Sequence, residues 1–247
     1  MLLLKMVRPK LLLTTILVLL GIALCIRLGI WQLDRLEGRR SFNIQIETMR
    51  SLPALDLNQE DLDFINKMEW RAVQVNGTFD FENQIAIRNQ YYDNQFGYHL
   101  LTPLLFNEKA ILIDRGWIPA DGNSTPADWR KYDEVGDVNV EGQIRLGQVK
   151  PTFGGVADTL PARGAPLEVW NNADITQIAK QLPYPILPVY IQPRPEAGDT
   201  EPPIPFQPEI ELTEGPHFGY ALQWFTFAAI LFVGYPIYLR KQEAALT

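Results

Sequence analysis

Two uncharged, apolar stretches near the ends of the chain constrain its fold more than any other feature. Residues 11–26 read LLLTTILVLLGIALCI, and residues 218–239 read FGYALQWFTFAAILFVGYPIYL. A helix that crosses a membrane needs about 20 residues at about 1.5 Å each. The second stretch reaches this length alone, and the first does so when the apolar residues past Arg27 are included, because a long cationic side chain can extend to the headgroups. We therefore expect transmembrane helices at 11–33 and 217–239.

The first apolar stretch also has features of a cleavable secretory signal, because Lys5, Arg8 and Lys10 precede it. No small-x-small cleavage site follows, however, and the chain continues as apolar rather than polar sequence. A lipoprotein signal would need a small residue before Cys25, where the sequence has Leu24. We therefore interpret the stretch as an uncleaved anchor.

The charges that flank the two stretches predict an orientation. Both tails, residues 1–10 and 240–247, are net positive, and cytoplasmic segments carry the excess of Lys and Arg. The whole chain has a net charge of −7, so the part between the spans is acidic. We expect both termini in the cytoplasm and an acidic domain outside it. Such a domain argues against nucleic acid as a partner and allows a basic protein partner.

Residues 34–216 are expected to form an α+β domain that the two spans flank. Apolar spacing predicts that the first helix continues out of the membrane until Leu52–Pro53 ends it. Short helices are expected at 56–68 and at 172–182, the latter capped by Asp174 or Asn172. Runs rich in β-branched and aromatic residues predict a mainly antiparallel sheet or barrel, with strands near 71–80 (around a turn-like Asn-Gly), 84–92, 98–106, 109–117 and 137–147.

A proline-rich loop is expected at residues 183–208. Residues 186–193, ILPVYIQP, could still form an edge strand, because a proline lacks the N–H that an interior strand donates. The remainder is expected to be an extended connection into the second span. The predicted fold class is thus a membrane-anchored α+β protein with a mainly antiparallel β domain.

Most catalytic motifs are missing from the sequence. There is no phosphate-binding loop and no dinucleotide fingerprint, and none of the serines lies in a nucleophile-elbow context. The single cysteine, Cys25, excludes an internal disulfide, and the two histidines, His99 and His217, are too isolated to predict a zinc site. Paired carboxylates stay possible, but no spacing distinguishes any of them. The sequence therefore predicts no enzyme.

His217 lies at the start of the second span, where a neutral imidazole could ligate haem iron. Small residues on the same face would let a flat group or another helix approach closely. The alternative is an interfacial histidine in an aromatic belt. Helical spacing places one stripe on this face: His217, Ala221, Trp224, Ala228, Leu231 and Tyr235.

Two further patterns have both a structural and a functional interpretation. Gly21, Cys25 and Gly29 recur every four residues in the first span, which favours close packing on the second span or on a client protein. In ILIDRGWIP, Arg115 could pair with a carboxylate while Trp117 covers the core edge. Alternatively, Arg115 could hold an acidic group of a ligand, such as a propionate.

Four motifs together resemble the surfeit locus protein 1 family, the assembly factors of haem–copper oxidases. They occur in one order over nearly the whole chain: LGIWQLDRLEGR, GYHLLTPL, ILIDRGWIP and HFGYALQWFTFA. The family's histidine and tryptophan at the second span correspond to His217 and Trp224, and its Arg-Gly-Trp turn corresponds to Arg115, Gly116 and Trp117.

The resemblance implies a bacterial assembly factor for cytochrome c oxidase that acts as a chaperone in biogenesis of the respiratory chain. Haem a would be a transiently bound cargo with His217 as iron ligand, and Trp224, Arg115 and Trp117 would contact the haem. The implied partners are the oxidase catalytic subunit, the haem a synthase and the lipid bilayer. The short tail before the first span leaves no room for a mitochondrial presequence, so we expect the bacterial inner membrane.

Other hypotheses stay open at this point. The chain could be a membrane scaffold that stabilises the immature catalytic subunit without binding haem, with its aromatic stripe packed on client helices. A membrane-tethered enzyme would need a catalytic cluster, and a sensor would need a larger cytoplasmic part than either tail provides.

Overall fold

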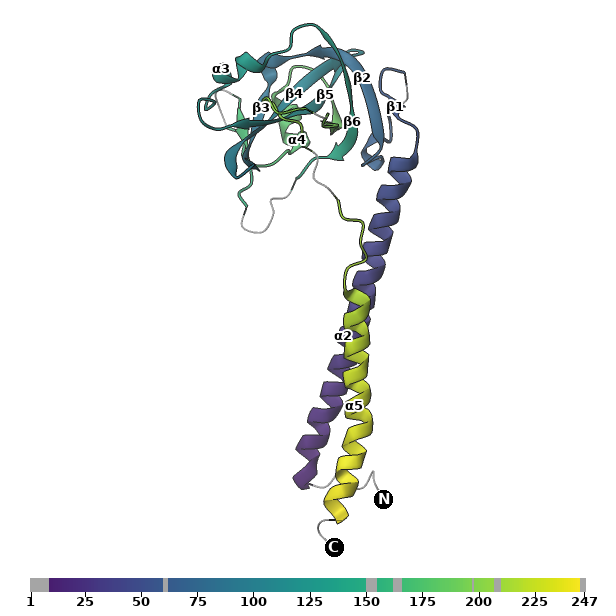
Figure 1. The fold of residues 1–247 in the computed structure, drawn as a ribbon. Helices are drawn as coiled ribbons and strands as arrows, with labels where there is room; N and C mark the ends of the chain where they lie inside the picture. Colours follow the sequence, from purple (N-terminus) through teal and green to yellow (C-terminus); the bar gives the residue numbers. More distant parts are fainter. Residues whose placement is uncertain are drawn as a thin grey trace. The chain divides into compact units, whose positions relative to one another are not determined.

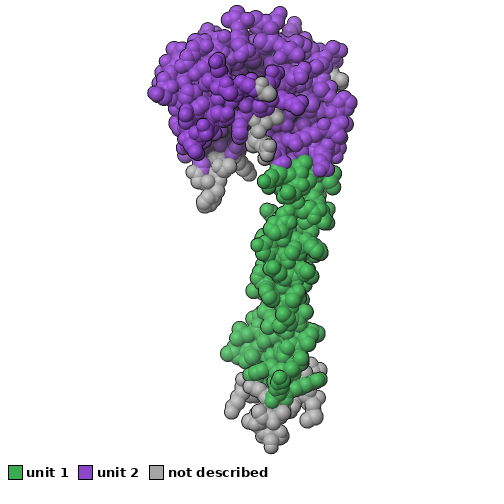
Figure 2. Space-filling model, in the orientation of Figure 1, with its two compact units in different colours: residues 1–45, 211–247 green, residues 46–210 purple. Residues whose placement is uncertain are grey.

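The computed structural model contains two compact units, which Figure 2 shows in different colours. The helix unit consists of residues 1–45 and 211–247, and the β unit consists of residues 46–210. The described residues are 9–59, 62–149, 155–161, 166–196, 198–206 and 210–244. Residues 1–8 and 245–247 of the expected cytoplasmic tails lie outside them.

Two long helices account for most of the helix unit: α2, Pro9–Ser51, whose residues from Ile46 onward belong to the β unit, and α5, His217–Ala244 (Figure 1). The first ends directly before Leu52–Pro53, as expected, because the residue before a proline is disfavoured in helical geometry. By length and composition both helices could cross a membrane, and only 11% and 17% of their most apolar windows are buried. Apolar helices with so much exposed surface favour anchoring in a membrane over a role as core helices.

The helices α2 and α5 are antiparallel neighbours. The hydroxyls of Thr15 and Tyr235 are hydrogen-bonded at 2.6 Å, and further along the pair Gly29 lies against the ring of Phe225, where a Cβ would come within 2.7 Å of a ring carbon. Cys25, between these two points, is only 8% exposed. The small-residue pattern of the first span therefore serves packing between the chain's own two helices.

The described residues of the β unit form eight strands and several short helical turns. The strands are β1 Leu55–Asp56, β2 Ala72–Phe79, β3 Ile85–Tyr92, β4 Gln95–Phe106, β5 Lys109–Pro119, β6 Asp137–Leu146, β7 Val169–Trp170 and β8 Ile186–Pro193. The α-helical turns are α3 Pro126–Trp129 and α4 Ile175–Ile178, and single 3₁₀ turns lie at Ile65–Lys67, Phe81–Asn83, Arg130–Tyr132 and Ala179–Gln181.

Five of the strands close into a small barrel. Hydrogen bonds join β2 to β6, β6 to β8, β8 to β5, β5 to β4, and β4 back to β2. The remaining strands extend the sheet, with β3 on β4, β7 on β3 and β1 on β2. Three pairings are parallel, β1–β2, β3–β7 and β5–β8, and the others are antiparallel. The expected mainly antiparallel β domain is confirmed.

Alternation along β5 separates two apolar clusters. Ile111 and Ile113 pack in the larger cluster with side chains of β2, β6 and β8, whereas Leu112 packs on the other face with Trp170 and Ile175. Successive residues of a strand point to opposite faces of the sheet, and β5 is buried on both. This explains why β5 reads as an almost uninterrupted apolar run.

Two expectations for local structure are wrong. A capped helix at 56–68 is absent from the described part of this segment: Leu55–Asp56 pairs with β2 as a strand, and only Ile65–Lys67 forms a 3₁₀ turn. Burial of Leu55 and Leu57 in the larger cluster outweighs helical propensity there. The Asn-Gly at 76–77 is also no turn, because β2 runs straight through it.

Gly77 lies at the point where the barrel closes. Its neighbour Thr78 pairs with Leu105 of β4, and a Cβ on Gly77 would lie 2.3 Å from the carbonyl oxygen of Leu105. A glycine is needed here because the two backbones approach more closely than any side chain allows.

The strand expected at 186–193 is confirmed as β8, but its expected edge position is wrong. It lies between β5 and β6 in the barrel. Its register with β5 slips between Ala110 and Leu112, opposite the part of β8 that contains Pro188. The missing proline N–H therefore falls where the ladder is irregular. Of the two expected caps for the helix near 172–182, Asp174 is the one that accepts a hydrogen bond, from the backbone N–H of Gln177 at 3.1 Å.

Substitution of Gly77→Ala tests the closure of the barrel. We expect it to lower the free energy of unfolding of the β unit by about 3 kcal/mol, because the new methyl group would overlap a backbone oxygen. Urea unfolding of the full chain in mild detergent, followed by near-UV circular dichroism, measures the change. In the control Gly122→Ala the methyl group meets nothing within 4 Å, and the left-handed backbone alone costs about 1 kcal/mol. Equal losses in both variants would contradict this account.

Candidate functional site

His217 is the first residue of α5, and its ring is hydrogen-bonded to α2. The distance from Nδ1 to the side-chain oxygen Oε1 of Gln32 is 2.9 Å. An amide oxygen only accepts, so Nδ1 carries the proton and donates it. Nε2 of the neutral ring is then the acceptor that can bind a metal, and a bond of this kind at Nδ1 commonly fixes the orientation of a ligating histidine. The sequence did not identify Gln32, which is only 9% exposed.

The expected stripe lies on the side of α5 that packs against α2. Ala221 is 1% exposed and Ala228 is 6% exposed, while Trp224 is half-buried and lies edge-on to Phe227 with ring centroids 6.0 Å apart. The two alanines are thus used for helix packing and present no open face to a flat ligand. His217, Trp224 and Tyr235 are the members of the stripe that are only half-buried and keep some polar or aromatic surface accessible.

Arg115 lies in the β unit, where its guanidinium contacts other residues of the same unit. It lies over the rings of Phe79 and Phe81 at 5.3 and 5.1 Å, and it donates to Gln84 at 3.3 Å and to Glu134 at 3.1 Å. The residue is 6% exposed. Burial lowers the pKa of the guanidinium and the Glu134 charge opposes this, yet an arginine stays charged at neutral pH. These contacts favour the structural interpretation of Arg115.

Trp117 is also packed in the β unit, with 4% of its surface exposed. Its ring lies 5.4 Å from that of Tyr92, and its backbone exchanges hydrogen bonds of 2.8 and 2.9 Å with Ile204. Gly116 beside it has φ of +119°, a conformation that L side chains rarely adopt. The expected turn at Arg115, Gly116 and Trp117 is wrong, because these residues lie within β5, where the register with β4 shifts. Haem contact by Arg115 and Trp117 stays a prediction.

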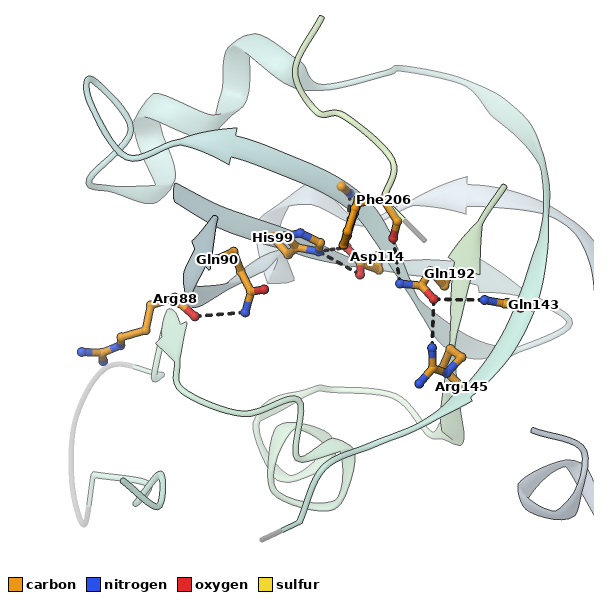
Figure 3. A network of polar contacts seen from close by, with 9 residues as sticks. Arg88, Gln90, His99, Asp114, Gln143, Arg145, Gln192 and Phe206 are labelled. Carbon is orange, nitrogen blue, oxygen red and sulfur yellow. Dashed lines mark hydrogen bonds and ion pairs between the residues drawn. The ribbon is translucent and has the colours of Figure 1, made fainter. Parts of the chain in front are cut away.

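A buried pair that the sequence did not reveal lies on the neighbouring strands β4 and β5. His99 Nδ1 donates to both carboxylate oxygens of Asp114 at 3.0 Å (Figure 3). The backbone N–H of Gly116 donates to the same carboxylate at 3.2 Å. His99 and Asp114 are 9% and 6% exposed. Their positions on two successive predicted strands were the available signal, but the pairing depends on a register that the sequence did not determine.

Asp114 controls the charge of His99. Burial acts to lower the pKa of the imidazole, but the charge of Asp114 and its hydrogen bond together outweigh burial, so the pKa is raised above 6.5. The Asp114 carboxylate therefore favours the imidazolium form of His99, in which both ring nitrogens are donors.

Arg145 on β6 extends this polar region. Its guanidinium lies 3.7 Å from the ring centroid of Trp70, pairs with Glu69 at 3.4 Å and donates to Gln192 at 3.1 Å. Gln192 in turn donates to the backbone oxygen of Phe206 at 2.8 Å. Figure 3 shows His99, Asp114, Gln192 and Arg145 side by side. Within the described ranges, no group of three or more His, Cys, Asp or Glu side chains could hold a metal ion.

Fold and sites together define a protein with two distinct parts. The chain joins a pair of membrane-length apolar helices to a closed β unit. A histidine at the start of the second helix is set in the tautomer that binds metals.

The comparisons with known proteins identify the family. The sequence model of the SURF1 family matches residues 19–229, so the chain belongs to the SURF1 family. The SURF1-like protein of Rickettsia bellii is 26% identical over 233 residues, which cover 92% of this chain and 91% of that protein. Surfeit locus protein 1 of Xenopus tropicalis is 24% identical over 220 residues, covering 82% and 68% of the two chains. Members of this family are oxidase assembly factors, and membership supports a role in cytochrome c oxidase assembly.

Substitution of Asp114→Asn tests the control of His99. The raised pKa means that protonation of His99 contributes stability below pH 6.5, and that this contribution is lost as the pH rises through the pKa of the folded chain. Without the carboxylate charge, burial remains, and we expect the pKa to fall below 6.5. Histidine-labelled NMR in a His217→Ala background, which leaves one histidine, measures the titration. An unchanged pKa would contradict the role of Asp114.

Proposed function

We propose that this chain is a membrane-anchored assembly factor of cytochrome c oxidase that binds haem a through His217 and aids its insertion into the catalytic subunit. Haem a is the cargo, so its binding must be reversible. The oxidase role follows from the family. The observation that carries the haem proposal is the hydrogen bond from His217 Nδ1 to Gln32, which leaves Nε2 for iron.

The surroundings of His217 suit a ligand with an apolar body. The ring is half-buried, and exposed aromatic side chains are sequence neighbours of the two hydrogen-bonded residues: Trp31 precedes Gln32 on α2, and Phe218 and Tyr220 follow His217 on α5. Trp224, two turns further along α5, is the second residue that we assign to haem contact. A site at the rim of a membrane would leave the apolar tail of haem a in lipid and its propionates near water.

The proposed location is the bacterial inner membrane, with both termini in the cytoplasm and the β unit outside it. The antiparallel packing of α2 and α5 supports a topology in which both ends of the chain lie on one side. The positive tails and the acidic remainder support the cytoplasm as that side. The proposed partners are the lipid bilayer, the oxidase catalytic subunit and the haem a synthase that would supply the cargo.

A second candidate function is a scaffold that holds the immature catalytic subunit without binding haem. The burial of Ala221 and Ala228 favours it, because these residues pack the helix pair and leave no open face for a flat ligand. In that case the exposed aromatic side chains of α5 would contact helices of the client. The two candidates differ in whether the purified chain carries haem.

The haem proposal is tested by optical spectra of the full chain. The chain is co-expressed with the enzymes of haem a synthesis, purified in mild detergent and compared with His217→Ala. We expect a haem a signal in the reduced-minus-oxidised spectrum that is lost or shifted in the variant. Folded protein without haem, made where haem a is abundant, would support the scaffold. Haem bound equally by both proteins would overturn the assignment of His217.

The Gln32 hydrogen bond is tested by a pair of variants. Gln32→Leu removes the acceptor of Nδ1, and we expect haem affinity to fall by about 10–100-fold, the range typical of lost outer-shell partners. Gln32→Glu keeps an oxygen at that position and is expected to retain most of the affinity. If both variants bind haem like the wild type, Gln32 does not position the ligand.

A further inference from the structure

A cavity of about 510 Å³ in the β unit has no part in the function proposed above. Polar side chains predominate in its lining, among them His99, Asp114, Arg145 and Tyr190, and a few apolar side chains such as Leu101 add apolar surface. These four polar residues lie on β4, β5, β6 and β8, which are strands of the closed barrel, while β3 and loop segments complete the wall. Concave sites in which polar groups converge beside apolar surface are typical places for small ligands.

Two hydrogen-bond donors of this cavity have no partner among the described residues. His99 uses Nδ1 for Asp114, while Nε2 has no partner, and the side chain keeps 11% of its surface exposed. The hydroxyl of Tyr190 has no hydrogen bond to any described residue either. Burial, and then the nearby charge of Asp114, raise the pKa of this phenol to about 12, so it stays a neutral donor at physiological pH.

The charges around the cavity are already paired with one another. Asp114 has the imidazole of His99, and Glu69 has Arg145 at 3.4 Å. The imidazolium form of His99 would therefore hold one carboxylate at Nδ1 and offer Nε2–H to a second acceptor. Hydrogen bonds from a charged donor to a carboxylate are about twice as strong as neutral ones.

We propose that this cavity binds the carboxylate group of a small organic acid, with His99 Nε2 and the Tyr190 hydroxyl as donors and Arg145 as a nearby cation. A metal ion fits less well, because a protonated imidazole offers no lone pair. Two sources share the chemistry of the ligand: a fatty acid, and a porphyrin that carries propionates. The site contains neither His217 nor any other residue of the helix unit.

The test uses the full chain in mild detergent at pH 6, labelled at histidine, because the two histidines give one set of NMR signals for each site. Octanoate and metal-free protoporphyrin are the two acids, and octanamide and protoporphyrin dimethyl ester are their neutral counterparts. We expect at least one acid to shift the His99 signals and to bind at least tenfold more tightly than its counterpart. The acid that meets both expectations shows whether the ligand is a fatty acid or a porphyrin.

Two variants separate this site from the proposed haem site. Tyr190→Phe removes only the hydroxyl, and we expect it to weaken binding of the acid about tenfold while the neutral counterpart is unaffected. His217→Ala is expected to leave binding of the acid unchanged, even if it abolishes binding of haem a. Binding should also weaken as the pH rises and His99 loses its proton. The other charged groups that line the cavity are Asp114, Arg145 and Glu69.

Three results would overturn the proposal. The first is equal affinity for acids and neutral counterparts. The second is a failure of both acids to move the His99 signals in folded protein. The third is loss of acid binding in His217→Ala but not in Tyr190→Phe, which would place the acid in the helix unit instead.

Discussion

The register between β4 and β5 determines which functional side chains meet. Leu100 lies opposite Gly116 and Leu101 lies opposite Asp114, so Arg115 is an extra residue that forms a bulge. The bulge allows Arg115 to contact Phe79 and Phe81 while Asp114 contacts His99. The same two strands hold β3 on one side and β8 on the other, so the barrel and its cavity are built around this pairing.

The two units of the chain satisfy the hydrogen bonds of their polar groups in different ways. In α2 and α5 the helix satisfies the backbone internally, as an apolar solvent requires, and apolar side chains are left exposed. In the β unit the apolar clusters are buried, and several buried polar groups are paired, as His99 is with Asp114, although the indole N–H of Trp117 has no partner among the described residues.

The two histidines of the chain share a local design with different electrostatics. Each donates Nδ1–H to a side-chain oxygen of a neighbouring element, Gln32 for His217 and Asp114 for His99. Gln32 offers a neutral oxygen, whereas Asp114 adds a negative charge that favours the imidazolium. The first arrangement suits ligation of a metal, and the second suits recognition of an anion.

The sequence by itself determined the features that depend on local composition. Two uncharged apolar runs predicted both helices, alternation predicted the main strands, and four motifs indicated the family. Only the tertiary structure decided which residues meet across long distances in the sequence. It paired His217 with Gln32 and His99 with Asp114, it placed β8 inside the barrel, and it showed that Gly77 closes the barrel rather than forming a turn. The reason is that register, closure and burial depend on the whole fold, whereas hydropathy and periodicity act over a few turns of helix or a few residues of strand.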